Sequence, residues 1–247
     1  MELGLNLQIL NIAFYRFVQL TDLVSLRQLL TQHCQDLKLK GSILLSPEGV
    51  NGYLAGPVDS VRGFQKFLNE NPLFGGIDFK ESKSNFIPYQ RLRIKLKKEI
   101  IATGDSSVQP KRDAVPRVSP QTLKKWLDEQ QSFQLLDTRN DYEVEHGSFS
   151  QAIHLGLKHF RDFAEKMEKL PLSVKNRPWV VFCTGGIRCE KAGILAKRYG
   201  VQEVYQLEGG ILNYFKECGG SHYQGGCFVF DERVALDSDL KPIVAGH

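Results

Sequence analysis

VVFCTGGIRCEKA, residues 180–192, predicts a buried strand, a glycine-rich loop that opens with a cysteine, and the start of a helix over residues 189–199. Gly185 and Gly186 let the loop backbone curl so that its amide hydrogens point inward, and the helix directs its positive end toward the same place. A thiolate or persulfide anion at Cys183 would be stabilised there, which lowers the pKa of the thiol. The stretch therefore predicts a reactive cysteine at the carboxyl end of a strand, where α/β sheets bind ligands.

Two cysteines in this stretch each allow a second interpretation. Cys183 is alternatively a small buried side chain that precedes a helix, since free cysteines are often core hydrophobes. The glycines and Arg188 beside it favour the functional interpretation. Cys189, six residues further along, is either a resolving thiol or an early helix residue with no further role, and we prefer the latter.

Strands and helices alternate on both sides of the cysteine loop. We predict strands over residues 134–136, 153–155 and 202–207, and helices that start at 119, cover 158–170 and end near 216. This alternation predicts a parallel sheet flanked by helices. Asp137, Cys183 and Glu208 each lie at the end of a predicted strand, which places them at one edge of that sheet.

The first half of the chain has a different order of elements. Strands are predicted over residues 11–19, 42–46, 52–55, 77–83 and 92–101, with helices over 22–37 and 57–71. The order is that of a ferredoxin-like, or acylphosphatase-like, α+β domain. We therefore predict this domain over residues 1–102, a proline-containing linker over 103–118, the α/β domain over 119–218 and a C-terminal tail over 219–247.

The composition is that of an ordinary globular protein. The 247 residues include five cysteines, an odd number with no CxxC pair, which argues against a disulfide framework and a structural zinc site. No metal site is predicted. There is no signal-peptide pattern and no run of roughly 18 apolar residues that would span a membrane. We therefore expect a cytoplasmic protein without a membrane partner.

A basic segment in the first half suggests a nucleic-acid partner. The net charge is only +4, but residues 82–98 contain lysines and arginines and no acidic residue. Strand alternation places four cations on one face, and these are Arg91, Arg93, Lys95 and Lys97. This face is either a phosphate-binding surface or an ordinary solvated sheet face.

The spacing of Cys183 and Arg188 resembles the active loop of rhodanese domains. Four residues separate them, whereas phosphatases of similar fold have five, and the tighter ring suits a sulfur atom better than a phosphate. The segments DTR at 137–139, YE at 142–143 and LEGG at 207–210 also resemble rhodanese motifs. The resemblance makes Cys183 the nucleophile or persulfide carrier and Arg188 the group that holds an anion. Alternatively, Arg188 is an ordinary arginine at the start of a helix, paired with Glu190 or Asp137.

The rest of the active loop is expected to supply backbone amides and support. The residues assigned to the loop are Thr184, Gly185, Gly186, Ile187 and Cys189, and those assigned to its support are Asp137, Arg139 and Glu208.

Three longer strings together resemble one narrower family. They are SPEGVNG at 46–52, CTGGIRCEKA at 183–192 and LEGGILNY at 207–214, and the segment GCFVFDERV at 226–234 agrees with them. They are similar to the rhodanese-domain tRNA uridine hydroxylases. Many members continue into a cysteine-rich C-terminal segment that is not found here, so the chain is expected to be a short or truncated member.

The resemblance implies oxygen-dependent conversion of the wobble uridine of tRNA, position 34, to 5-hydroxyuridine, the first step toward 5-carboxymethoxyuridine. Its implied partners are tRNA and dioxygen. The cofactor stays unknown because no metal or flavin motif is seen, and so does any sulfur donor or reductant. Two alternatives remain: a persulfide sulfurtransferase, which the loop chemistry fits directly, and a non-catalytic tRNA-binding module, against which the intact Cys183 loop argues.

Overall fold

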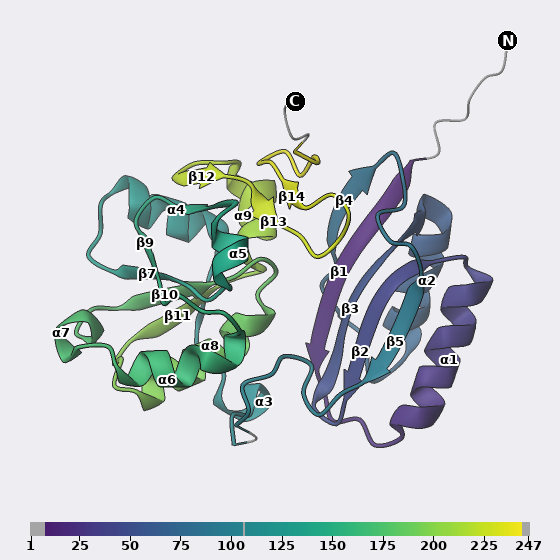
Figure 1. Cartoon of the computed structure of the whole chain (residues 1–247), viewed down its shortest axis with the longest axis horizontal. Helices are drawn as coiled ribbons and strands as arrows, with labels where there is room; N and C mark the ends of the chain where they lie inside the picture. The colour runs from purple at the N-terminus through teal and green to yellow at the C-terminus, as the bar shows by residue number, and fades with distance from the viewer. Residues whose placement is uncertain (1–7, 106, 244–247) are drawn as a thin grey trace, which may run out of the picture. The chain divides into compact units, whose positions relative to one another are not determined.

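The computed structural model describes residues 8–105 and 107–243, and the chain divides into two units (Figure 1). The first unit comprises Met1–Ile100 together with Asp231–Arg233, and the second comprises Ile101–Phe230 and Val234–His247. Within the described residues, none of the helices has the length and apolar character needed to cross a membrane.

The first unit is a five-stranded sheet with two helices. Its elements are β1 (Ile9–Phe17), α1 (Leu23–Asp36), β2 (Lys40–Ser46), β3 (Gly49–Pro57), α2 (Val58–Glu70), β4 (Lys80–Ser84) and β5 (Leu92–Leu96). The strand order is β4-β1-β3-β2-β5, and every pair is antiparallel except β2 with β5. This confirms the predicted ferredoxin-like α+β fold, which β5 extends by one strand.

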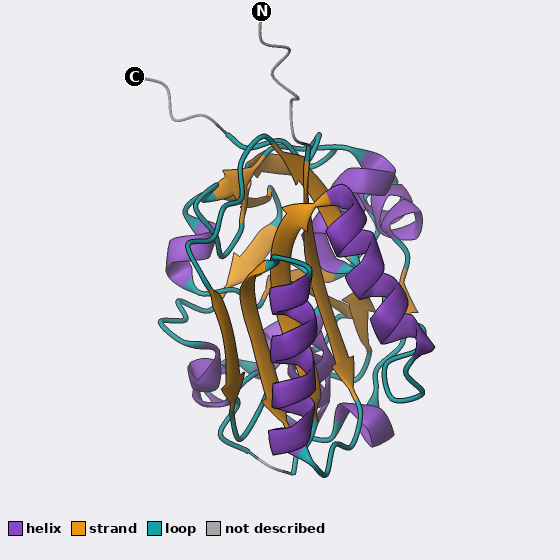
Figure 2. Cartoon of the chain, turned by 90° about the vertical axis from the view of Figure 1, so that its right-hand side faces the viewer, coloured by secondary structure: helices purple, strands orange, loops and turns teal. Residues whose placement is uncertain are grey.

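One face of this sheet carries the core of the first unit. Asp22 starts α1 by accepting a hydrogen bond from the Ser25 amide, as its position before an apolar periodic run predicts. Leu30 of α1 and Phe64 of α2 pack with strand residues such as Ile43 in one buried cluster. Figures 1 and 2 show α1 covering the sheet on the side that faces the viewer in Figure 2.

Three residues from the C-terminal tail complete the first unit. The Arg233 guanidinium donates to the Ser82 hydroxyl on β4, with 2.7 Å between the nitrogen and the oxygen. The Tyr89 hydroxyl donates to Asp231 at 3.2 Å, and the Glu232 amide donates to the Pro88 carbonyl at 3.2 Å. The predicted tail therefore supplies structural contacts to a sheet that lies about 150 residues earlier in the chain.

The second unit is built on a parallel sheet. Its elements up to the cysteine loop are α3 (Pro110–Asp113), β6 (Arg117–Val118), α4 (Pro120–Asp128), β7 (Gln134–Asp137), α5 (Asp141–Val144), β8 (Gly147–Phe149), β9 (Ala152–His154), η1 (Phe160–Asp162), α6 (Phe163–Glu168), α7 (Leu172–Lys175) and β10 (Trp179–Phe182). After the loop come α8 (Ile187–Arg198), β11 (Val204–Leu207), α9 (Gly210–Cys218), β12 (Tyr223–Gly225), β13 (Cys227–Phe228) and β14 (Ala235–Leu236).

Both faces of the parallel sheet are buried. The order is β6-β11-β10-β7-β9, with every neighbouring pair parallel. Along β10, Trp179 and Val181 point into one apolar cluster with α6 and α8, while Val180 and Phe182 point into another with α4 and α9. This confirms the predicted sheet flanked by helices and explains why β10 reads as a continuous apolar run.

Some predicted boundaries are wrong. Residues 103–118 are not a plain linker, because α3 and β6 lie inside it and β6 pairs with β11 at the edge of the sheet. A two-residue strand next to a proline has too few positions to show a periodicity. The helix predicted over 158–170 is a short turn of 3₁₀ helix followed by α6, and the helix predicted from residue 189 begins at Ile187.

Candidate active site

The cysteine loop connects the end of β10 to the start of α8. Gly186 precedes the helix with φ of 97°, a left-handed conformation that glycine adopts without strain. This conformation turns the Gly186 amide toward Cys183, where it donates a hydrogen bond to Sγ at 3.1 Å. The thiol is 1% exposed, so water does not screen the positive end of α8 there.

Cys183 is held as an anion by its surroundings. Burial opposes ionisation, but a hydrogen bond from the Cys189 thiol, the charge of Arg188, and the backbone amides of Arg188 and Gly186 outweigh it and lower the pKa of Cys183 to about 6. At pH 7 such a group has roughly ten thiolates for each thiol. A thiolate at the end of the strand suits the nucleophile that the sequence predicts at this position, and that role stays a prediction.

We expect the thiolate of Cys183 to form with a midpoint near pH 6 rather than near 9.0, the ordinary value for a cysteine. The measurement is the ultraviolet absorbance of thiolate as a function of pH, taken as the difference between the wild-type protein and Cys183→Ser. A difference spectrum with its midpoint above pH 8 would contradict the described electrostatics.

Cys189 is an early residue of α8, as preferred from the sequence, and its thiol also contacts Cys183. It is fully buried in the first turn of α8, and its thiol donates to Cys183. Burial, this hydrogen bond and the neighbouring anion raise the pKa of Cys189 well above its ordinary value. The proton therefore stays on Cys189, since two buried negative charges in contact repel each other.

Arg188 pairs with Glu143, which the sequence showed as part of a rhodanese-like motif but not as the partner of this arginine. Its guanidinium forms a two-pronged ion pair with Glu143, with nitrogen–oxygen distances of 2.7 and 2.8 Å, and both side chains are buried. Glu143 is 45 positions away in the sequence and belongs to α5. The planar fork of an arginine on a carboxylate fixes orientation as well as charge, so Glu143 holds Arg188 in place beside the loop.

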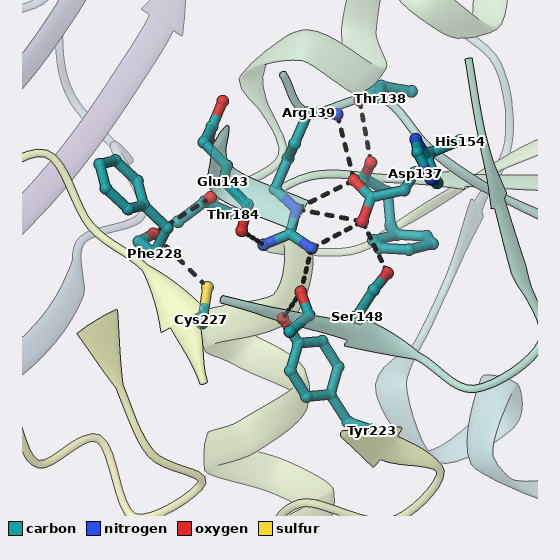
Figure 3. Close-up of polar contacts among 12 residues, drawn as sticks. Asp137, Thr138, Arg139, Glu143, Ser148, His154, Thr184, Tyr223, Cys227 and Phe228 are labelled. Atoms are coloured by element: carbon teal, nitrogen blue, oxygen red, sulfur yellow. Dashed lines mark hydrogen bonds and ion pairs between the residues drawn. The ribbon is translucent and has the colours of Figure 1, made fainter. Parts of the chain in front are cut away.

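Asp137 and Arg139 support the loop indirectly, through contacts that hold α5 in place (Figure 3). They form a fully buried ion pair, with 2.6 Å between Arg139 Nη2 and Asp137 Oδ2, and Ser148 also donates to Asp137 at 2.7 Å. The same Arg139 guanidinium donates to the Gly147 carbonyl at 2.6 Å and to the Glu143 carbonyl at 3.5 Å. Asp137 and Arg139 thus fix the turn that carries Glu143, and Glu143 fixes Arg188.

The turn between β11 and α9 braces the loop from the other side, but not through Glu208. The Glu208 side chain is exposed, and its backbone bonds to Val118 and Asn213. The amide of Ile211 donates to the Cys183 carbonyl at 2.9 Å, and the amide of Leu212 donates to the Thr184 carbonyl at 3.1 Å.

Gly210 lets these two turns approach each other. Its φ is 68°, and a Cβ at this position would lie 2.4 Å from the Cys183 carbonyl oxygen. Only glycine fits there without displacing the backbone of the cysteine loop. The sequence motif LEGG showed this glycine, but nothing in the motif indicated that it touches the loop.

The four basic residues predicted on one strand belong to the first unit. Arg91, Arg93, Lys95 and Lys97 are all exposed, and the apolar residues between them are partly buried against the core. Arg93 and Lys95 lie on β5, at the edge of the sheet, and Arg91 and Lys97 flank that strand. In the described part of the chain, no group of three or more histidine, cysteine or acidic side chains is placed to hold a metal ion.

Comparison with known proteins covers both units. The UPF0176 acylphosphatase like domain matches residues 9–100, and the rhodanese-like domain matches residues 119–217. A tRNA uridine(34) hydroxylase of Cupriavidus pinatubonensis is 46% identical over 241 residues, covering 96% of this chain and 86% of that protein. A protein of the same name from Thiobacillus denitrificans is 45% identical, and the match covers 96% of this chain and 98% of that protein. Another from Variovorax paradoxus is 47% identical, and the match covers 95% of this chain and 91% of that protein.

Proposed function

We propose, on the premise that this chain belongs to the tRNA uridine(34) hydroxylase family, that the Cys183 thiolate is the reacting group in the hydroxylation of uridine 34. The chain is accordingly an enzyme, an oxidoreductase that modifies tRNA. The observation that carries the role of Cys183 is its lowered pKa of about 6 at a buried helix N-terminus.

The groups around Cys183 suit a nucleophile that attacks a pyrimidine ring. Cys183 keeps its negative charge, Cys189 supplies a proton-bearing neighbour, and Arg188 provides a fixed positive charge. A thiolate is the strongest nucleophile that a side chain offers at neutral pH, and a pyrimidine ring presents electrophilic carbon to it. The site is thus suited to activating the uracil ring, in an orientation set by Arg188 and the loop amides.

Dioxygen is the proposed source of the new hydroxyl oxygen. Replacing the C5 hydrogen by a hydroxyl group with one atom of dioxygen leaves the second atom to be reduced to water, which requires two electrons and two protons. A two-electron donor is therefore a further partner of the enzyme. We place the reaction in the cytoplasm, where tRNA is modified.

Nucleoside analysis tests the proposed reaction. We expect tRNA from a strain that lacks the gene to lose 5-hydroxyuridine derivatives, and the wild-type gene to restore them, as measured by mass spectrometry. The control is a strain in which an unrelated tRNA-modification gene is deleted instead. Persistence of the derivatives in the deletion strain, without another route to them, would contradict the hydroxylase function.

A sulfurtransferase is the second candidate. The four-residue spacing of the loop and the lowered pKa of Cys183 both suit a persulfide on that sulfur. The same nucleoside analysis separates the two candidates, because a sulfurtransferase acting on tRNA would remove a thiolated nucleoside when deleted. Normal nucleosides in the deletion strain would instead favour a non-catalytic binding module.

The basic face of β5 is the proposed tRNA contact. Four exposed cations alternate with partly buried apolar residues over Arg91 to Lys97, so the four charges face solvent, where phosphates can approach them. Such contacts release counterions, so they appear in the salt dependence of binding rather than in sequence preference.

We expect Arg93→Glu to weaken tRNA binding and to reduce the slope of log K against log salt by about one. Lys66→Glu is the matched control, because Lys66 lies on α2 of the same unit with its side chain 76% exposed and undergoes the same charge change. The two variants are compared by filter binding across a range of salt concentrations. Equal effects of the two substitutions would show a loss of overall charge and would remove β5 as the contact.

A further inference from the structure

Three aromatic side chains lie beside the cysteine loop. The stabilisation of the Cys183 thiolate described above does not involve them. Tyr142 lies on α5, Phe228 ends β13 and Phe230 follows two residues later. We call these three residues the aromatic cluster. Phe228 packs edge-to-face against both of the others, with ring centroids 5.3 Å from Tyr142 and 5.2 Å from Phe230. Such packing fixes the rings in one arrangement.

Two of the three rings in the cluster are exposed to water. Tyr142 is 43% exposed and Phe230 is 39% exposed. Isolated exposed hydrophobic residues need no explanation, but neighbouring exposed aromatic rings mark a binding surface. The rings are also held in place before any ligand arrives, so little entropy is lost when one binds.

The cluster is tied to the cysteine loop at two points. The Arg188 guanidinium lies over the Phe230 ring, 5.8 Å from its centroid, and Arg188 is one of the residues that, with Cys189 and Gly186, lower the pKa of Cys183. The Thr184 hydroxyl donates to the Phe228 carbonyl at 3.5 Å, a contact drawn in Figure 3. Thr184 directly follows Cys183, so these two contacts place the cluster next to the loop that contains the reactive sulfur.

We propose that Phe230 is a stacking platform for the uracil ring of uridine 34, held in position by Phe228 and flanked by Tyr142. This inference rests on the proposed function, which brings that base to Cys183. A base that leaves the stack of an RNA loop loses its neighbours, and an aromatic side chain replaces them without demanding a particular sequence. Phe230 is therefore a positioning residue, which holds the ring while Cys183 acts on it.

The test compares two substitutions at Phe230 on two RNAs. Phe230→Leu keeps an apolar side chain without a π face, and Phe230→Tyr keeps the face. The RNAs are a tRNA anticodon stem-loop with uridine 34 and the same RNA with an abasic residue at that position. The full-length protein is used throughout, and its binding is measured by fluorescence anisotropy.

We expect Phe230→Leu to raise Kd for the uridine RNA by at least about fivefold, within the range of about 5- to 150-fold that corresponds to the loss of one stacked base. Phe230→Tyr is expected to change it by less than about twofold, and neither variant is expected to change binding of the abasic RNA. KM for hydroxylation should rise with Kd, because the Cys183 loop is untouched. Leu172→Ala is the control for a lost exposed apolar side chain, since Leu172 is 72% exposed on α7, well apart from β13 within the second unit (Figure 1).

Several outcomes would overturn the inference. An equal loss of binding to both RNAs would mean that Phe230 contacts something other than the base, and an equal loss in Phe230→Tyr and Phe230→Leu would exclude stacking. If the wild-type protein hydroxylates uridine 34 while Phe230→Leu behaves like wild type, the inference fails and the proposed function stands. If the wild-type protein forms no 5-hydroxyuridine, the proposed function fails, whatever the binding results show.

Discussion

Cys183→Ser is expected to abolish 5-hydroxyuridine formation in a deletion strain that expresses the variant, and to lower kcat by about 10³-fold or more in a purified assay. Serine has the right size for the loop, but its hydroxyl does not ionise near neutral pH. The amide of Gly186 and the charge of Arg188 would then surround a neutral group. The measurement is nucleoside mass spectrometry of tRNA from the complemented strain.

Cys218→Ser is the matched control for this experiment. Cys218 is another free cysteine of the second unit, at the end of α9, and it is only partly buried. We expect it to retain wild-type activity. Wild-type levels of 5-hydroxyuridine in the Cys183→Ser strain would show that the sulfur takes no part in the reaction, and the function would then rest on another group.

Glu143→Ala is expected to destabilise the protein by about 3–5 kcal/mol, the cost of removing one partner of a buried ion pair. Glu143 is fully buried, and both of its oxygens accept from Arg188. The substitution deprives the buried guanidinium of these acceptors and frees Arg188 from the position in which it stabilises the thiolate. Urea unfolding of the variant measures the loss in free energy, and the pKa of Cys183 should rise in the same variant.

Glu145→Ala makes a close control. Glu145 lies two residues further along but is exposed, so its removal should change the free energy of unfolding by no more than about 0.5 kcal/mol. Similar unfolding curves for the two variants would show that the Glu143–Arg188 pair contributes nothing beyond an ordinary surface charge.

Local patterns in the sequence predicted most of the elements, and they placed Cys183 at the end of a strand and before a helix. The apolar run of β10, the glycines after Cys183 and the helix that follows are neighbours in the chain, so the chemistry of the loop follows from its own residues. The alternation along β5 likewise predicted which of its side chains are exposed. The ferredoxin-like order followed from the succession of strands and helices.

These local patterns could not predict contacts between segments that are far apart in the sequence. Glu143 meets Arg188 only because β7 and β10 are adjacent in the sheet, and neither residue type nor spacing indicates that pairing. The contact of Gly210 with the Cys183 carbonyl has the same kind of origin, because β10 and β11 are adjacent, while the packing of Phe230 under Arg188 depends on a segment after β13, outside that sheet. In each case a single acidic, glycine or aromatic residue carries no local periodicity that would reveal its partner.

The three tail residues at Asp231–Arg233 make the first unit discontinuous in the chain. During synthesis, residues 1–100 leave the ribosome long before the groups that hydrogen-bond to Ser82, Pro88 and Tyr89 exist. The edge of that sheet near β4 therefore closes only after Ile101–Phe230 of the second unit have been made, although domains near the N-terminus ordinarily fold first. For the same reason, a fragment cut at residue 100 is an incomplete copy of this unit, and any study of its RNA binding in isolation would have to supply Asp231, Glu232 and Arg233 again.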